Sequence, residues 1–193
     1  RFCTSSQLTF LGRETYSSVG EAAKAGRLAV YFQRKVHIRT GSLAGAEALV
    51  RGVGEDGSAV APAGFVHLLE EEGNIRELDL FVLDRALAQV DRWREEGLAV
   101  VPVSVNLSRV TLRHPSTLAS VLAIQSRYPR LPPETLELEI TESADALETG
   151  QLKEVVERFR ACGLRIGLDD FGSQYANLPL FANVKFDVVK LDR

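Results

Sequence analysis

VVPVSVNLS (100–108), TLELEITES (135–143) and LRIGLDDFG (164–172) are the short apolar runs that decide how this chain folds. Each run has the length and the apolar or β-branched character of a buried strand. Two helix-like segments separate them, HPSTLASVLAIQSRYP (114–129) and DALETGQLKEVVERFRACG (145–163). The alternation of strand and helix, with a period of roughly 30 residues, predicts parallel α/β architecture.

The same pattern extends on both sides of this stretch. LAVYFQRKVHI (28–38) and LAGAEALVR (43–51) are two strand-like runs joined by a turn, which predicts a hairpin with an antiparallel first strand. Residues 61–97 carry the apolar spacing of two helices, residues 176–184 that of a short helix, and FDVVKLD (186–192) that of a last strand. About six strands are therefore expected, whereas a complete (β/α)8 barrel has eight strands and about 250 residues.

Two architectures fit about six strands. One is an open α/β sheet, and the other is a barrel of which this chain holds the first part. The barrel fits better, because a chain that stops at a strand tip leaves an exposed sheet edge, which native proteins avoid. The barrel domain is expected over residues 21–193, truncated at its C-terminus, after a Ser/Thr-rich lead-in or linker at 1–20 and a short helix at 21–27.

The composition describes an ordinary soluble domain. The chain has 193 residues, of which 45% are hydrophobic and 25% are charged. The net charge of -3 gives no indication of a DNA-binding surface. Cys3 and Cys162 have neither disulfide nor metal spacing, which predicts free thiols in a reducing compartment. No membrane segment and no leader is expected, and a chain that starts at Arg1 without any Met is expected to be a fragment.

A side chain that suits a hard metal site closes each of five strand-like runs. In a barrel of parallel strands these ends meet at one face. Carboxylates and an amide, with no Cys or His among them, favour Mg2+ or Mn2+ over Zn2+. The residues are Glu47, Asn106, Glu139, the pair Asp169 and Asp170, and finally Lys190 with Asp192. For Asp192 a salt bridge or a loop contact is as good an interpretation as a ligand.

The Asp169–Asp170 pair favours two metal ions rather than one. Two metals about 4 Å apart need shared carboxylates. Because neighbouring residues on a strand point to opposite faces, the pair is expected where the strand ends and turns, at Phe171–Gly172. Glu137 lies on the same face as Glu139 but is interpreted as structural. Lys35 is interpreted as a strand charge without a role.

Five motifs, in order, resemble those of the EAL domain, a bacterial family of phosphodiesterases that hydrolyse cyclic di-GMP. They are EALVR (47–51), SVNLS (104–108), ELEITES (137–143), LDDFGSQYANL (168–178) and VKLDR (189–193). YFQRKV (31–36) resembles the first strand of the family, and the resemblance covers about residues 27–193. It implies a modified TIM (β/α)8 barrel with an antiparallel first strand, incomplete in this chain, and an active site at the C-terminal strand ends.

The resemblance also implies a two-metal site. Glu47, Asn106, Glu139 and Asp169 would bind a first Mg2+ or Mn2+, and Asp169 with Asp170 would help to hold a second. Lys190 would orient or deprotonate the attacking water, and the metals would lower its pKa. Glu47, Asp170 and Lys190 are thus the expected catalytic residues.

Further roles follow from the same resemblance. Gln33 and Arg51 would contact the dinucleotide. Glu142 would brace the loop after Asp170, which in this family supports metal binding and dimer coupling. The resemblance also implies a homodimer, a sensory or GGDEF-type domain in the full-length protein, and a place in the bacterial cytoplasm.

Two functions from different classes remain open at this point. The retained ligands predict a metal-dependent phosphodiesterase that converts cyclic di-GMP to linear pGpG. The alternative is a catalytically weak or inactive EAL-type domain that acts as a cyclic di-GMP receptor or protein-interaction module. Three departures favour the alternative: Arg34 replaces a Pro, GVGEDG follows Arg51, and Gln174 replaces a Gly. A later glutamate and glutamine of the family would lie beyond Arg193.

Overall fold

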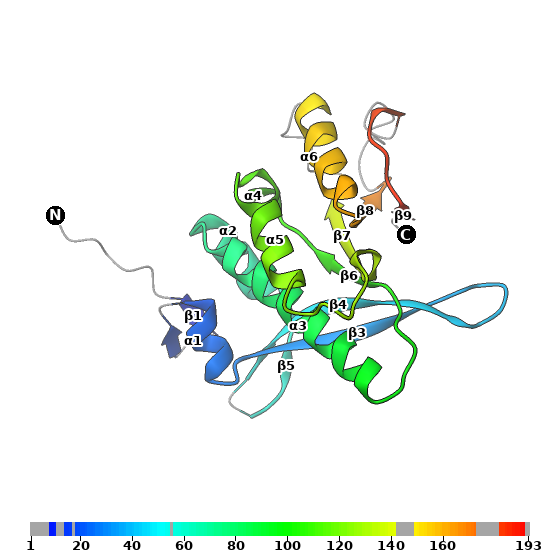
Figure 1. The fold of residues 1–193 in the computed structure, drawn as a ribbon. Coiled ribbons are helices and arrows are strands. Elements are labelled where there is room, and N and C mark those ends of the chain that lie inside the picture. The colour runs from blue at the N-terminus through cyan, green and yellow to red at the C-terminus, as the bar shows by residue number, and fades with distance from the viewer. Residues whose placement is uncertain are drawn as a thin grey trace.

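A single seven-stranded sheet organises the molecule (Figure 1). The computed structural model describes residues 8–10, 14–16, 18–54, 56–141, 149–172 and 182–191. Within them the strand order is β3-β4-β6-β7-β8-β9, and the short β5 pairs with β4. These strands are β3 (Leu28–Val36), β4 (Leu43–Val53), β5 (Ala59–Val60), β6 (Val103–Asn106), β7 (Leu136–Thr141), β8 (Arg165–Phe171) and β9 (Val188–Leu191).

The strand directions confirm the predicted fold class. β3 pairs with β4 in antiparallel fashion, as the predicted hairpin requires. From β4 onward each successive pair along the main path, β4–β6, β6–β7, β7–β8 and β8–β9, is parallel. The result is a modified TIM-type sheet that is incompletely closed, with β3 and β9 at its two ends. All six predicted strands are present, and β5 is an addition that the sequence pattern did not predict.

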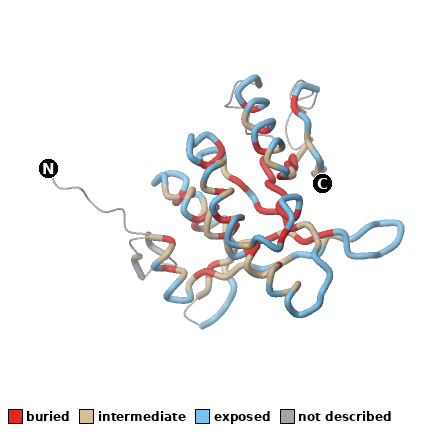
Figure 2. Tube along the Cα trace, in the orientation of Figure 1, coloured by how far each residue is buried: buried red, intermediate tan, exposed pale blue. Residues whose placement is uncertain are grey.

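The helices cover one face of this sheet (Figure 1). They are α2 (Ala63–Glu71), α3 (Ile75–Glu95), α4 (Arg109–Arg113), α5 (Thr117–Gln125) and α6 (Thr149–Ala161), with a 3-10 turn η1 at Pro133–Thr135. Buried apolar residues gather where helices and strands meet (Figure 2). On β7, for example, Leu136, Leu138 and Ile140 belong to this core. Because side chains alternate along a strand, the opposite face of β7 is free to carry polar groups.

The N-terminal part of the chain contains more structure than the expected lead-in. β1 (Leu8–Phe10) and β2 (Glu14–Tyr16) form an antiparallel pair. Helix α1 (Val19–Lys24) begins two residues before the predicted segment 21–27, because the Ser18 side chain accepts a hydrogen bond from the Glu21 amide at 3.2 Å. The Glu77 carboxylate of α3 accepts two more amides of this first turn, which ties α1 to the core.

Two further differences from the sequence pattern have local causes. Helix α4 was not predicted, and it begins at Arg109, directly after the N-cap Ser108, whose Oγ accepts the Thr111 amide at 3.2 Å. Helix α5 begins at Thr117, after this short helix, rather than at the start of the predicted segment 114–129. The helix predicted at 176–184 lies mainly outside the described residues. None of the described helices combines the length and apolarity that crossing a membrane requires.

Candidate metal centre and adjoining cavity

Neighbouring strands of the sheet bring the predicted acids together, although Glu47 lies within β4, opposite Ser104 of β6, and does not close its strand as predicted. Asn106 pairs with Glu139 in the register of β6 and β7, and Glu139 pairs with Gly167 on β8. Carboxylate oxygens of Glu47, Glu139 and Asp169 lie within 4.8 Å of one another. The sequence separates these acids widely, so the parallel sheet is what creates the cluster.

Lys190 of β9 lies at the point where the three carboxylates converge. Its Nζ is 2.8 Å from Asp169 Oδ2, 3.0 Å from Glu139 Oε2 and 3.2 Å from Glu47 Oε2. Lys190 therefore reaches β4 although three strands separate β9 from β4 in the sheet order, which shows that the sheet curves strongly. Three carboxylates against one ammonium leave a net negative charge at this point.

Asn106 completes the set of oxygen donors. Its Nδ2 donates to Glu47 Oε1 at 3.2 Å, so the carbonyl oxygen Oδ1 is the amide atom that could coordinate a cation. Three carboxylates and one amide oxygen form a hard donor set of the kind that Mg2+ and Mn2+ prefer. The cluster is thus chemically compatible with a divalent cation.

The carboxylates around Lys190 stabilise its charged form. Burial alone would lower the pKa of Lys190, but hydrogen bonds to Asp169 and Glu139 and the charges of Glu139 and Glu47 outweigh it and raise the pKa above its ordinary value. The expected lowering of this pKa depends on bound metals, so it stays a prediction. With the acids as its neighbours, Lys190 is a firmly protonated donor.

The two neighbouring aspartates lie at a bulge. The register between β8 and β9 shifts between Leu168 and Phe171, and Asp170 has a φ of 55° in the left-handed region. A left-handed residue interrupts the regular alternation of side chains along the strand. The Asp170 amide donates to Asp169 Oδ1 at 2.9 Å, which orients the Asp169 carboxylate. The irregularity thus lies at the aspartates themselves, inside β8, which continues to Phe171, whereas the prediction put a turn after the pair, at Phe171–Gly172.

A second layer of charges lies beneath the cluster. Lys35 of β3 donates to Glu139 Oε1 at 2.8 Å and to Glu137 Oε1 at 2.9 Å. Arg165 Nη2 lies 3.5 Å from Glu137 Oε2. Room for both glutamates comes from Gly167, where a Cβ would lie 3.2 Å from Glu139 Cγ and 3.8 Å from Glu137 Oε1. Neither Lys35 nor Arg165 was assigned a role from the sequence pattern.

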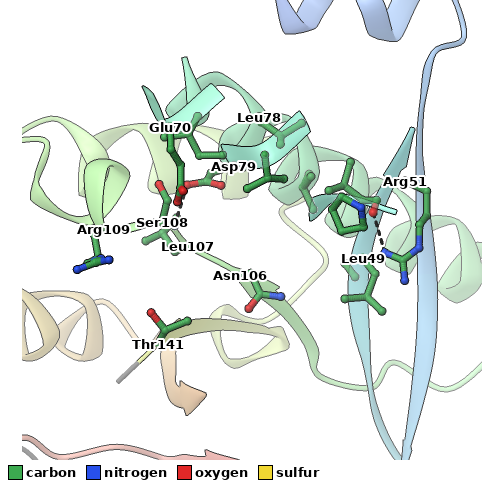
Figure 3. A pocket seen from close by; sticks show the side chains of 16 residues that line it. Leu49, Arg51, Glu70, Leu78, Asp79, Asn106, Leu107, Ser108, Arg109 and Thr141 are labelled. Carbon is green, nitrogen blue, oxygen red and sulfur yellow. Dashed lines mark hydrogen bonds between the residues drawn. The ribbon is translucent and has the colours of Figure 1, made fainter. Parts of the chain in front are cut away.

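A cavity of about 460 Å³ adjoins the cluster. Asn106 lines this cavity and also bonds Glu47, so the amide connects the two. Arg51 and Arg109 lie on opposite sides of the cavity with Asn106 between them (Figure 3). The remaining lining residues are mostly apolar, and they include Leu49, Val66, Leu78 and Val82. A largely apolar wall with a few polar groups is typical of a small-molecule site.

Asp79 is the buried acid of this cavity wall. Its Oδ2 accepts the Ser108 amide at 2.9 Å, which ties α3 to the end of β6. Burial raises the pKa of Asp79, although hydrogen bonds from Ser108 and Thr111 oppose the rise. This hydrogen bond holds in place the segment that follows Asn106, so Asp79 stabilises this part of the cavity wall.

The remaining predicted residues are distributed as follows. Gln33 is exposed on β3, where it pairs in register with Glu47, and it does not line the cavity. Arg51 lines the cavity while its Nη1 donates to the Val50 carbonyl at 2.7 Å. Glu142 lies outside the described residues. The roles assigned to these three residues stay predictions.

Comparison with known proteins gives matches over most of the chain. The EAL domain family model matches residues 17–193. The bifunctional diguanylate cyclase/cyclic di-GMP phosphodiesterase MucR of Pseudomonas aeruginosa is 31% identical over 90% of this chain and 25% of its own length. The cyclic di-GMP phosphodiesterase PA2567 of the same organism is 31% identical over 84% of this chain and 27% of its own length. The chain thus spans about a quarter of these relatives.

Solved structures of other proteins also align with most of this chain. A structure named PaMucR phosphodiesterase, c-di-GMP complex, aligns with a TM-score of 0.82 and 30% identity, covering 90% of this chain and 70% of its own. The FimX EAL domain from Pseudomonas aeruginosa bound to c-di-GMP aligns with a TM-score of 0.78 at 22% identity, covering 90% of this chain and 69% of its own. At that identity the second match supports the fold alone.

Proposed function

The chain belongs to the EAL domain family, and from this premise we propose that it is a divalent-cation-dependent phosphodiesterase that opens cyclic di-GMP to linear pGpG. One observation carries the proposal. Glu47, Glu139 and Asp169 come from three separate strands and bring carboxylate oxygens within 4.8 Å of one another. Barrel enzymes place their catalytic groups at one face of the parallel strands, and this cluster of one buried and two partly buried acids lies beside a cavity.

The donor set fits the proposed cofactor. Glu47, Asn106, Glu139 and Asp169 would hold a first Mg2+ or Mn2+, and Asp170 would join Asp169 in holding a second. When bound, such cations neutralise the phosphodiester, activate water and stabilise the leaving oxygen. The net negative charge of the cluster and the absence of softer ligands among its members support this assignment.

Lys190 has the position of a group that orients the attacking water. Its Nζ is within 3.2 Å of all three carboxylates, so the ammonium points into the centre of the site. We infer that Lys190 orients or deprotonates the attacking water, and the second role requires that bound metals lower its pKa. Glu47 and Asp170 complete the proposed catalytic set.

The substrate is proposed from the cavity and from the relatives. The cavity volume of about 460 Å³ falls within the range of roughly 300–1,000 Å³ that is usual for small-molecule sites. Arg51 and Arg109 supply positive charge on its two sides (Figure 3), which suits a dinucleotide with two phosphates. The names of MucR and PA2567 support cyclic di-GMP as that dinucleotide. Gln33 is proposed as a second contact.

The larger setting of the domain is proposed in the same way. The bifunctional name of MucR, of which this chain spans 25%, supports a GGDEF-type or sensory domain in the full-length protein. A homodimer coupled through the loop after Asp170, with Glu142 bracing that loop, and a place in the bacterial cytoplasm complete the proposal.

A turnover assay tests the function. The chain is incubated with cyclic di-GMP and Mn2+, and the products are separated by chromatography. We expect linear pGpG to form, to disappear on addition of a chelator, and to disappear in Glu47→Gln. Lys153→Met changes an exposed lysine of α6 and serves as the control, with activity equal to wild type.

The same assay separates the competing functions. Intact nucleotide that remains bound to the protein would show a receptor and would overturn the hydrolase proposal. A protein that neither binds nor cleaves cyclic di-GMP would overturn both. Glu47→Gln activity equal to wild type would show that the acid cluster is not the reaction centre.

A further inference from the structure

Lys35 makes contacts that neither the sequence pattern nor the proposed function uses. It lies on β3, which two strands separate from β7 in the sheet order, yet its Nζ reaches both buried glutamates of β7. Its stem passes Gly45, where an added Cβ would lie 3.8 Å from Lys35 Cδ and 2.9 Å from the Pro102 carbonyl oxygen. The Lys35 side chain therefore crosses the inner face of the curved sheet in the space next to Gly45. A larger residue at position 45 would narrow that space.

We propose that Lys35 is a positioning residue that holds Glu139 Oε1 and so leaves Oε2 as the only ligand oxygen of that glutamate. The inference rests on the proposed function, because it concerns how the same site binds its cation. Each oxygen of Glu139 has its own lysine: Oε1 lies 2.8 Å from Lys35, and Oε2 lies 3.0 Å from Lys190. Only Oε2 is on the side of Lys190, which also contacts Glu47 and Asp169.

Glu139 has little other freedom to turn. Its side chain is fully buried, and Gly167 on the neighbouring strand lies against its Cγ. A partial rotation of the carboxylate about its last bond would break the contact with Lys35, whereas a half turn restores the same contacts because the two oxygens are equivalent. The contact thus leaves one oxygen facing the cluster and fixes its direction.

Lys35 is itself held in place by Glu137. Glu137 Oε1 accepts from Lys35 at 2.9 Å, and Glu137 Oε2 lies 3.5 Å from Arg165. A chain of alternating charges therefore runs from Arg165 through Glu137 and Lys35 to Glu139. Partners of this kind, one step outside the ligands, orient metal ligands, and their loss typically reduces metal affinity by about 10–100-fold.

A purely structural role for Lys35 makes a different prediction. In that case Lys35 only compensates the buried charge of Glu137, and removing Glu137 as well would repair every defect. If Lys35 positions Glu139, removal of Glu137 repairs stability alone. The double variant Lys35→Met/Glu137→Gln separates these two roles.

The test measures Mn2+ binding without nucleotide, by electron paramagnetic resonance of free Mn2+, and unfolding by urea on the same samples. We expect Lys35→Met to weaken Mn2+ binding by about 10–100-fold. The double variant should recover part of the stability that Lys35→Met loses but keep the weakened Mn2+ binding, and it carries the test if Lys35→Met alone does not fold. Lys153→Met, a matched substitution at an exposed ion pair with Glu157, should bind Mn2+ like wild type.

Three results would overturn the inference. Wild-type Mn2+ affinity in Lys35→Met, or recovery of both stability and affinity in the double variant, would leave Lys35 with a structural role while the proposed function stands. A wild-type chain that binds no Mn2+ would overturn the inference together with the proposed metal site.

Discussion

Glu137 and Glu139 lie on the same face of β7 and are both buried, yet their surroundings differ. Glu137 contacts two cations, Lys35 and Arg165, and its charge is balanced within the protein. Glu139 also contacts two lysines, but Lys190 is shared with two further carboxylates. Burial alone therefore does not distinguish a metal ligand from a structural acid. What distinguishes Glu139 is that the carboxylates around it outnumber the cations.

The largest expected effect comes from removing the ligand of this pair. Glu139→Gln keeps the shape of the side chain but removes the charge that the cluster needs. We expect Mn2+ affinity to fall by more than the roughly 100-fold upper limit that is typical of outer partners, and turnover to be lost with it. Isothermal titration with Mn2+ measures the change, and an affinity within tenfold of wild type would contradict it.

Glu137→Gln should have the opposite profile. Lys35 keeps Glu139 as a partner, whereas Arg165 loses its buried acid. We expect a loss of about 1–3 kcal/mol in the free energy of unfolding, as for other lost charged hydrogen bonds. Urea unfolding measures it. Mn2+ affinity should stay close to wild type, and a loss as large as that of Glu139→Gln would remove the distinction between the two acids.

A smaller effect is expected at the glycine that faces both glutamates. In Gly167→Ala the new Cβ would lie 3.2 Å from Glu139 Cγ, so the ligand must shift. We expect Mn2+ binding to weaken by a factor of about 3–10, at the low end of the costs of overpacking. Gly150→Ala is the control, because nothing lies within 4 Å of a Cβ there. Equal Mn2+ binding by both variants would show that the ligand is not confined.

Asp79 extends the comparison to a buried acid held by hydrogen bonds. Burial raises the pKa of Asp79 above its unfolded value, so the folded state binds its proton more tightly. The stability that this gives is present below the unfolded pKa and is lost as pH rises through the folded pKa. We therefore expect the stability of wild type, relative to Asp79→Asn, to fall as the pH rises above the ordinary pKa of an aspartate, about 4. Urea unfolding at several pH values measures this difference, and a rise with pH would contradict it.

The sequence predicted the strand ends but not the contacts across the sheet. Apolar periodicity locates strands and helices, and parallel strands bring their ends to one face, so Glu47, Glu139 and Asp169 could be grouped in advance. The position of Lys35 opposite β7 depends on the curvature of the whole sheet, which local pattern does not contain.

Short elements were missed for a related reason. Helix α4 and strand β5 are too short to show a period, and α4 exists because of one cap, Ser108. The bulge at Asp170 depends on a left-handed residue that is not glycine, which sequence seldom signals. The need for a break between the two aspartates, however, followed from strand geometry.

Anomalous X-ray scattering from crystals of the chain soaked in Mn2+ tests directly whether the acid cluster binds a divalent cation. We predict a strong anomalous peak among the oxygens of Glu47, Asn106, Glu139 and Asp169, with Glu139 bound through Oε2. If no peak appears at this position and Lys190 still contacts all three carboxylates, the acid cluster is not a metal site.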